Sequence, residues 1–437
     1  MEVSVAGVLF GIFFLLAFTG VPIAFALGIA SIVAGSMILP YEIILTIISQ
    51  RMVSGLDNFS LLAIPFFILA GSLMNHGGIA LRLINFAQLF VGRMPGSLGH
   101  VNVVANMLFG SISGSATAAA AAVGGTMAPL QKEAGFPPEY SASLNITSCV
   151  TGLLIPPSNV MIIYAVTAGN ISIAALFVAG YLPGILMGLL LIAVGYIISK
   201  RRGYQTSQEH SLRDALKAFI AAIPSLSLIF LILGGIVSGA FTATEASVVA
   251  VLYALILSMF FYRSIKIRQL PKIFMESAVT TSAVLVLVAM SISMSWVMAR
   301  AEIPQTITDA LLTISDNKII ILLIINIILI VVGIFMDMTP AILIFTSIFL
   351  PVATKIGMDP MHFGIMMIFN LCIGLCTPPV GVALFVGCSV AKVSVKQVLL
   401  PIMPFFLALL IGLALVVAFP QLSLWLPELM GLIDRPN

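Results

Sequence analysis

A single carboxylate, Asp337, lies inside an otherwise uncharged stretch that runs from Ile319 to Thr354. An ionisable side chain in such an apolar setting is costly, so it is a candidate functional residue. Its oxygens suit a cation. Asp337 also suits the start of a helix, because Asp followed by Met-Thr-Pro is typical of a capped helix N-terminus. The two roles are compatible, and the sequence favours the cation ligand.

Hydroxyl, amide and carboxylate groups also gather where glycine or proline interrupts an apolar stretch. Hard oxygen atoms are the ligands that a dehydrated sodium ion requires, and N–H groups left free at a helix start suit an anion. The positions that could supply such groups are Ser113, Ser115, Ser158, Asn159, Asp337, Thr339, Thr377 and Gly381. For Ser113 and Ser115, close packing of small residues between helices is a competing explanation.

Arg300 ends a second uncharged stretch, residues 277–299, and stands beside Glu302. A planar guanidinium binds carboxylates through two parallel hydrogen bonds, so Arg300 could contact an acidic substrate. It could equally anchor a helix at the membrane interface or pair with Glu302. The sequence does not decide between these roles.

Other polar residues in apolar segments favour structural roles. Glu245 stands in GAFTATEAS (239–247), where we expect it to satisfy backbone groups at a turn. A polar group, Asn145, Thr147 and Ser148, is expected to form hydrogen bonds between helices. The cysteines all lie in apolar segments and are expected to pack as small hydrophobic side chains: Cys149, Cys372, Cys376 and Cys388.

Several classes of protein are excluded by missing motifs. The sequence contains no GxxxxGK[ST] loop for ATP and no HExxH metal motif. The serines near 111–115 have no plausible histidine partner, so we expect no enzyme and no cofactor. Neither ATP nor nucleic acid is an expected partner. Energy for any transport must therefore come from an ion gradient or from another subunit.

The composition identifies a membrane protein. Of 437 residues, 61% are hydrophobic and 8% are charged, whereas soluble domains are about 45–50% apolar and about 25% charged. Residues 140–199 contain no Asp, Glu, Lys or Arg, and a single membrane span needs about 20 apolar residues. The N-terminal apolar segment has no basic residue before it, so we expect it to be a mature span rather than a signal peptide.

The chain repeats itself at an offset of 222 residues. Pro129 then matches Pro351, and the pair Pro156-Pro157 matches Pro378-Pro379. Gly135, Pro138 and Gly152 likewise match Gly357, Pro360 and Gly374. Residues that break helices fix the backbone path, so shared breakers predict a shared fold.

The sequence predicts the same order of elements for both halves. Two apolar helices around a short turn precede an amphipathic interfacial helix, a span, a hairpin whose two half-length helices meet at a polar tip, a span broken by Pro-Pro, and a closing span. The ranges are 3–18, 21–38, 42–56, 59–76, 97–131, 138–169 and 172–199 within residues 1–210, and 224–239, 243–262, 264–279, 281–299, 319–353, 360–391 and 396–420 within residues 211–437.

The predicted topology is a pair of inverted repeats. Five crossings in each half, with hairpins that return to the side they left, place the second half upside down relative to the first. With the N-terminus outside, 14 of the 19 Lys and Arg lie inside and 5 lie outside or in the membrane, as the positive-inside rule requires. Both termini are therefore expected on the periplasmic side, and the breaks of each repeat are expected to meet near the midplane.

At these residues the sequence resembles the large membrane subunit of the tripartite ATP-independent periplasmic (TRAP) transporters, within the wider superfamily of ion-coupled transporters with paired hairpins. The motifs that carry the resemblance are TGVPIAFALG (19–28), IPFFILAGSLM (64–74), SGSATAAAAAVG (113–124), GAFTATEAS (239–247), ARAEIPQ (299–305), GIFMDMTPAILI (333–344) and the two Pro-Pro loops. Family members often have Pro where Ala243 stands, which affects no candidate site residue.

This resemblance implies an all-α transporter of the bacterial inner membrane that imports an organic acid by sodium-driven elevator motion of a transport domain against a scaffold. It implies sodium sites at Ser113, Ser115, Gly152, Pro156, Ser158, Asn159, Asp337, Thr339, Gly374, Thr377, Pro378 and Gly381. It also implies substrate contacts at Arg300, Ser115 and Asn159. Sodium would be the only metal ion bound.

The implied partners are a small four-helix membrane subunit and a periplasmic protein that delivers the substrate. The helices at 42–56 and 264–279 would link the mobile and fixed parts. Among organic acids, sialic acid is slightly favoured over a C4-dicarboxylate on general similarity. The alternative is a stand-alone sodium or proton carrier of the same fold, in which Asp337 would carry a proton.

Overall fold

The computed structural model describes residues 2–169, 171–204, 212–315 and 317–433, and these residues form helices without strands. The first half contains α1 (Glu2–Phe18), α2 (Ile23–Gly35), α3 (Tyr41–Leu56), η1 (Phe59–Leu62), α4 (Ala63–His76), α5 (Ile79–Val91), α6 (Ser97–Ser113), α7 (Ala116–Glu133), α8 (Pro138–Cys149), η2 (Thr151–Leu153), α9 (Asn159–Ala168) and α10 (Ile173–Arg202). The second half contains α11 (Leu212–Val237), α12 (Ala243–Ile256), η3 (Leu257–Phe261), η4 (Ile267–Gln269), α13 (Leu270–Arg300), α14 (Ile303–Ile314), α15 (Lys318–Phe335), α16 (Met338–Lys355), α17 (Pro360–Cys376), α18 (Val382–Ala391), α19 (Val395–Ala418) and α20 (Gln421–Leu429).

The helix boundaries repeat at the offset found in the sequence. Helix α7 spans residues 116–133 and α16 spans 338–355, so both ends are displaced by 222 residues. The starts of α8 and α17, and of α10 and α19, are displaced by the same amount. Both hairpin breaks and both Pro-Pro breaks predicted from the sequence are therefore present. The predicted boundary between the halves, 210–211, lies outside the described residues, as do both chain ends and Arg435.

Eight helices are long and apolar enough to cross a membrane within the described residues. The arms of the second hairpin, α15 and α16, are among them because each has 18 residues. Helices α1, α2, α9, α17 and α18 contain shorter apolar segments. The chain is thus a multi-pass membrane protein, and the assignment of five crossings to each half stays a prediction.

One sequence prediction was wrong. The interfacial helix expected at 264–279 and the span expected at 281–299 form one continuous helix, α13, of 31 residues. In the first half the corresponding helices are separated at Asp57 and Asn58, because the Asn58 side chain accepts a hydrogen bond from the N–H of Ser60 and starts a new helical turn. At the equivalent residues of the second half, Val279 and Thr280, the Thr280 hydroxyl instead donates to the carbonyl oxygen of Glu276 in the preceding turn, and the helix continues.

Three helices were not predicted. Helices α5 and α14 follow α4 and α13 at equivalent places in the two halves, and α20 follows α19 near the C-terminus. Each is short and carries both polar and apolar residues. The prediction rested on long apolar stretches; α5 and α14 lie in the connections between the predicted elements, and α20 begins just after the last predicted span, 396–420.

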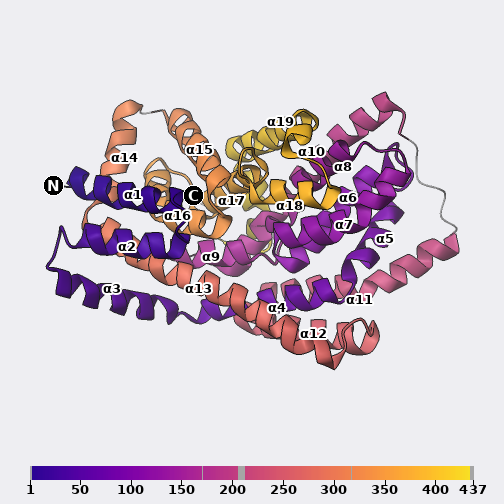
Figure 1. Cartoon of the computed structure of the whole chain (residues 1–437), viewed down its shortest axis with the longest axis horizontal. Coiled ribbons are helices and arrows are strands. Elements are labelled where there is room, and N and C mark those ends of the chain that lie inside the picture. The colour runs from indigo at the N-terminus through magenta and orange to yellow at the C-terminus, as the bar shows by residue number, and fades with distance from the viewer. Residues whose placement is uncertain (1, 170, 205–211, 316, 434–437) are drawn as a thin grey trace.

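The helices form two packed groups (Figure 1). We call α1–α4 and α11–α13 the frame helices; within them α2 packs on α13, and α4 packs on α12. We call α6–α10 and α15–α20 the hairpin body. In it, α7 packs on α18 and α16 packs on α9, so each hairpin contacts the broken helix of the other half. The two halves therefore interlock around one centre.

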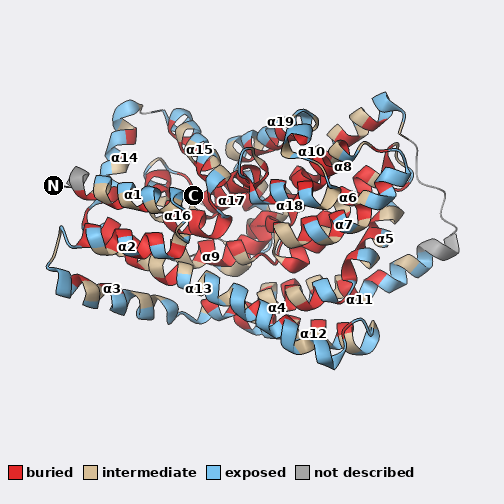
Figure 2. Cartoon of the chain, in the orientation of Figure 1, coloured by how far each residue is buried: buried red, intermediate tan, exposed pale blue. Residues whose placement is uncertain are grey.

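The most deeply buried helices are the first parts of the two broken helices. Every residue of α8 from Tyr140 and every residue of α17 from Met361 is buried, and buried residues fill the middle of the molecule in Figure 2. Such helices have no face that meets solvent or lipid, so their polar residues must find partners inside the protein. The arms of each hairpin pack against the buried helix of the same half, α6 and α7 against α8 and α15 and α16 against α17.

Candidate functional site

The two hairpin tips are sharp reversals between helices. In the first hairpin α6 ends at Ser113 and α7 begins at Ala116, and Gly114 between them has a φ of 61°. Glycine adopts this left-handed conformation without a steric penalty. In the second hairpin α15 ends at Phe335 and α16 begins at Met338. Each tip leaves the last carbonyls of one arm and the first N–H groups of the other without helical partners.

Glycine pairs bring each hairpin against a Pro-Pro loop. A Cβ placed on Gly152 would lie 2.3 Å from the Cα of Gly110, and a Cβ on Gly374 would lie 2.6 Å from the Cα of Gly333. Backbone therefore touches backbone at both places. This close approach carries the Pro-Pro loops to the hairpins, and it explains why glycine stands at both predicted positions.

Replacing Gly152 by Ala is expected to destabilise the protein by about 1–3 kcal/mol, because the new methyl group must push two backbones apart. The thermal unfolding midpoint of the purified protein measures this effect. Gly125→Ala in α7 is the matched control, since a Cβ there has no atom within 4 Å and Ala favours a helix. Equal midpoints for the two variants would contradict the close contact.

Helices α9 and α18 begin directly after the Pro-Pro loops, at Asn159 and Val382. The Ser158 hydroxyl donates a hydrogen bond of 2.6 Å to the carbonyl oxygen of Leu153, which holds the first loop closed. The Thr377 hydroxyl donates one of 2.7 Å to the carbonyl oxygen of Ile373. These two hydroxyls thus stabilise the loops that precede the helices.

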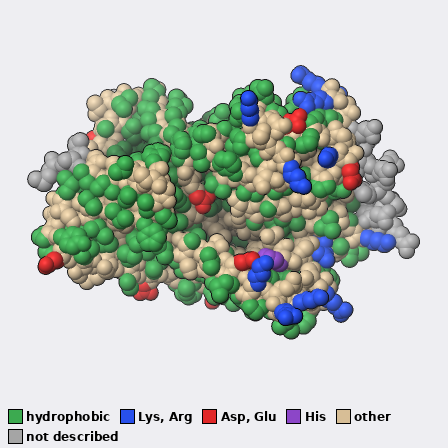
Figure 3. Space-filling model, in the orientation of Figure 1, with side chains coloured by type: hydrophobic (Ala, Val, Ile, Leu, Met, Phe, Trp, Pro, Cys, Tyr) green, Lys and Arg blue, Asp and Glu red, His purple; other side chains and the backbone are tan. Residues whose placement is uncertain are grey.

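A cavity of about 420 Å³ lies where the breaks meet. Its wall includes the first residues of four helices, α7, α9, α16 and α18, together with residues of α4 and α13. Figure 3 shows a hollow at the middle of the molecule with acidic atoms in it. Because helix N-termini carry partial positive charge, four of them around one cavity favour an anion.

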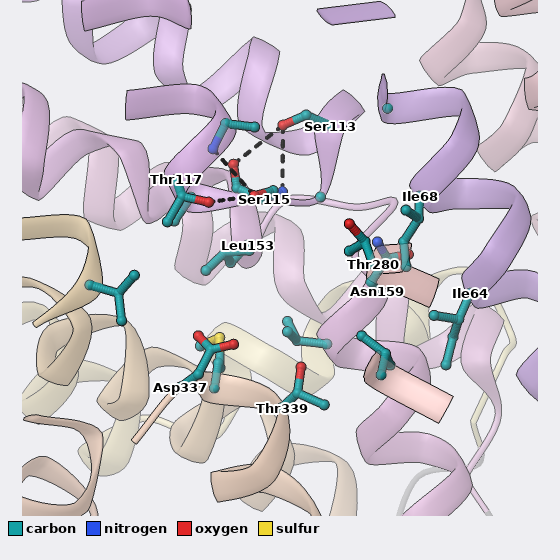
Figure 4. A pocket seen from close by; sticks show the side chains of 18 of the residues that line it. Ile64, Ile68, Ser113, Ser115, Thr117, Leu153, Asn159, Thr280, Asp337 and Thr339 are labelled. Atoms are coloured by element: carbon teal, nitrogen blue, oxygen red, sulfur yellow. Dashed lines mark hydrogen bonds between the residues drawn. The ribbon is translucent and has the colours of Figure 1, made fainter. Parts of the chain in front are cut away.

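Asp337 projects into this cavity (Figure 4). It occupies the position before α16, and its carboxylate lies against the backbone of Met338 without forming a capping hydrogen bond. Asp337 therefore occupies the N-cap position that the sequence suggested, but its side chain does not form the capping hydrogen bond. Among the described residues that line the cavity, Asp337 is the only charged one.

The first hairpin tip faces Asp337 across the cavity (Figure 4). The Ser115 hydroxyl accepts a hydrogen bond from the N–H of Ala118 at 3.3 Å and lies 3.0 Å from the Thr117 hydroxyl. Ser115 thus caps α7 while its hydroxyl borders the cavity. The side-chain oxygen of Asn159 is buried and has no hydrogen-bond partner within the described residues, so it is available to a ligand.

The structure brings five of the predicted site residues to the cavity wall: Ser113, Ser115, Asn159, Asp337 and Thr339. The others lie behind it in the Pro-Pro loops and glycine contacts: Gly152, Pro156, Ser158, Gly374, Thr377, Pro378 and Gly381. Arg300 is exposed at the end of α13 and does not line the cavity. Its contact with a substrate stays a prediction.

Sequence reasoning missed the wall formed by the frame helices. Ser72 and Asn75 of α4 and Thr280 of α13 line the same cavity as Asn159. Ser72 and Asn75 are three residues apart, so they share one face of an apolar helix. That spacing was a usable signal, and Thr117 beside Ser115 was another.

Asn145, Ser148 and Glu245 have the structural roles predicted for them. The prediction is wrong for Thr147, whose hydroxyl donates to the carbonyl oxygens of Ser143 and Leu144 within α8 rather than to another helix. The Asn106 amide donates to Asn145 at 3.0 Å and to Ser148 at 2.8 Å, which joins α6 to α8, and Asn145 donates to the carbonyl of Ala120 in α7. Glu245 and Thr242 form a reciprocal cap at the start of α12. The four cysteines are buried and form no disulfide.

Residues 10–422 match the family described as the DctM component of the tripartite ATP-independent periplasmic transporters. The chain is 54% identical to the uncharacterized protein YgiK of Salmonella typhimurium, covering 97% of both chains. It is 41% identical to the sialic acid TRAP transporter large permease SiaM of Vibrio cholerae, covering 95% of this chain and 96% of that one. It is 35% identical to the C4-dicarboxylate TRAP transporter large permease DctM of Rhodobacter capsulatus, covering 97% and 99%.

A solved structure shares the fold. The YdaH transporter of Alcanivorax borkumensis superimposes with a TM-score of 0.66 over 88% of this chain and 89% of that one, at 11% sequence identity. At this identity the likeness concerns the arrangement of helices.

Proposed function

The chain belongs to the DctM family of tripartite ATP-independent periplasmic transporters. We therefore propose that it carries an organic acid across the bacterial inner membrane, and that a sodium gradient drives this transport. The observation that supports this most directly is the central cavity, where four helix N-termini and one carboxylate surround the same space. The N-termini suit the acid, and the carboxylate suits the ion.

Sodium binding is proposed at the hairpin tips. The C-terminal carbonyls of α6 and α15 end beside the Pro-Pro loops, and hard oxygen ligands of this kind suit sodium. Asp337 adds a full negative charge, and Asn159, whose side-chain oxygen is buried without a hydrogen-bond partner within the described residues, lines the same cavity. A sodium ion held there would also offset the charge of the acid beside it.

An elevator motion is proposed because the hairpin body meets the frame helices through a loosely filled interface. A second cavity of about 230 Å³ lies between α13, α9 and α16, lined by Val288, Ser291, Thr167 and Ser347. At its edge the Ser295 and Ser347 hydroxyls are 3.0 Å apart. Within the part of the chain that the structure describes, few such polar contacts join the two groups, which favours sliding of one group against the other.

The structure corresponds, in this proposal, to a state open to the cytoplasm. Asn75 lies at the end of α4, a few residues before Arg82 at the start of α5, and Thr280 lies in the first half of α13, whose first turn contains Lys272. The charge bias assigns Arg82 and Lys272 to the inside. Arg300 is 20 residues beyond Thr280, about 30 Å along the helix. It would approach the substrate only after the hairpin body moves outwards.

The partners proposed are the small membrane subunit and a periplasmic binding protein, as the tripartite family description implies. The relatives named for sialic acid and for C4-dicarboxylates place the substrate among organic acids.

Uptake of candidate acids into proteoliposomes that contain all three components tests the function. We expect accumulation only with an inward sodium gradient and the binding protein. Sodium-driven uptake without the binding protein would instead support a stand-alone carrier.

A further inference from the structure

The cavity wall formed by the frame helices carries neutral polar side chains that ion binding does not use. Ser72 and Asn75 come from α4 and Thr280 comes from α13. Asn75 is exposed, and its amide can both donate and accept hydrogen bonds. Thr280 donates its hydroxyl hydrogen to the carbonyl oxygen of Glu276 at 3.0 Å, which leaves the oxygen free to accept. This wall therefore offers both donors and acceptors to the cavity.

The hairpin body contributes one further amide group to the cavity wall. Asn159 begins α9 on the hairpin-body side, and its side-chain oxygen is buried without a partner. Figure 4 shows Thr280 beside Asn159. A molecule that fills the cavity would thus meet helix N-termini at one end and amide and hydroxyl groups along its length.

None of the described residues that line the cavity carries a full positive charge. The cations at the starts of α5 and α13 already have partners: Arg82 stacks on the ring of Tyr262 at 3.6 Å, and Lys272 lies 3.9 Å from Glu276. Helix N-termini and a sodium ion can balance one carboxylate. A second carboxylate held against Asn75 and Thr280 would be desolvated without a counter-charge, which is costly.

We infer that the substrate is a monoanionic acid with a tail of several hydroxyl or amide groups, and that Asn75 and Thr280 bind this tail through hydrogen bonds. The inference rests on the proposed function and narrows its substrate class. The carboxylate of the acid lies at the hairpin tips, and the tail extends toward α4 and α13. Dicarboxylates fit this wall poorly.

Binding of named acids to the protein in lipid nanodiscs, at saturating sodium, tests this inference. The probes are gluconate and N-acetylneuraminate as hydroxylated monoanions, lactate as a short monoanion, and succinate as a dianion. We expect both hydroxylated acids to bind at least about tenfold tighter than succinate. Asn75→Leu and Thr280→Val should each weaken their binding about threefold to tenfold, the value of one hydrogen bond, without changing lactate binding.

Two further variants sharpen the result. Asn75→Lys supplies the missing cation, so it should improve succinate binding and weaken that of the hydroxylated acids. Thr313→Val is the matched control, because Thr313 is exposed and donates to an i−4 carbonyl as Thr280 does but lies on α14 away from the cavity; it should change nothing. Succinate binding as tight as gluconate, or equal losses for lactate and gluconate in Asn75→Leu, would overturn the inference alone. If none of the four acids bound, both the inference and the proposed function would be contradicted.

Discussion

Replacing Asp337 by Asn is expected to reduce sodium-driven uptake by about tenfold or more. The change keeps the shape of the side chain but removes the only charge among the described residues of the cavity wall. Hydrogen bonds and ion contacts to a charged group contribute about 1.5–3 kcal/mol, which corresponds to a tenfold to hundredfold change in affinity. The measurement is the sodium concentration that gives half-maximal uptake in proteoliposomes with all three components.

Asp309→Asn serves as the control for this prediction. Asp309 pairs with Lys355 at 3.1 Å on the exposed surface, and exposed pairs contribute about 0–1 kcal/mol. It should leave the sodium dependence unchanged. If Asp337→Asn left the half-maximal sodium concentration where it is in the unaltered protein, Asp337 would not be a ligand of the coupled ion.

Joining α13 to α16 with a disulfide is expected to stop transport almost completely. Ser295 and Ser347 have hydroxyls 3.0 Å apart, so a pair of cysteines at these positions is well placed to form a bond on oxidation. One residue belongs to the frame helices and the other to the hairpin body. The bond would fix the two groups in one position, and sodium-driven uptake should fall to background and return after reduction.

The single variants Ser295→Cys and Ser347→Cys control for the substitutions themselves, and both should transport under oxidising conditions. The native cysteines are all buried and unpaired, which limits unwanted bonds. Full uptake by the double variant after quantitative cross-linking would show that the two groups need not move, and the elevator proposal would fail.

Much of the architecture was accessible from the sequence because helix breakers mark it. Gly114 and the two Pro-Pro pairs set the tips and loops where the structure has them, and the uncharged surroundings of Asp337 identified it as a cavity residue. These signals are local: each depends on the backbone preferences or the charge of one residue. They can therefore be recognised without knowledge of the tertiary structure.

The remaining features depend on which helices meet. The polar wall of Asn75 and Thr280 was not predicted, because in the sequence each residue taken alone looks like a surface residue of an apolar helix. Only the packing of α4 and α13 beside the hairpin tips gives them a common cavity. The position of Arg300 is of the same kind, because its distance from the cavity follows from where the hairpin body sits along α13. The continuity of α13 was missed because repeat symmetry suggested a break that Val279 and Thr280 do not cause.

The central claim is that two hairpins enter the membrane from opposite faces and bring their tips to one cavity. Cysteines introduced at Arg93 and Lys318, both exposed near the open ends of the two hairpins, test it through labelling with an impermeant maleimide. Opposed hairpins predict that intact spheroplasts label position 318 and that position 93 reacts only after the membrane is opened. Labelling of both positions from the same face would contradict the claim and, with it, the assignment of a shared site.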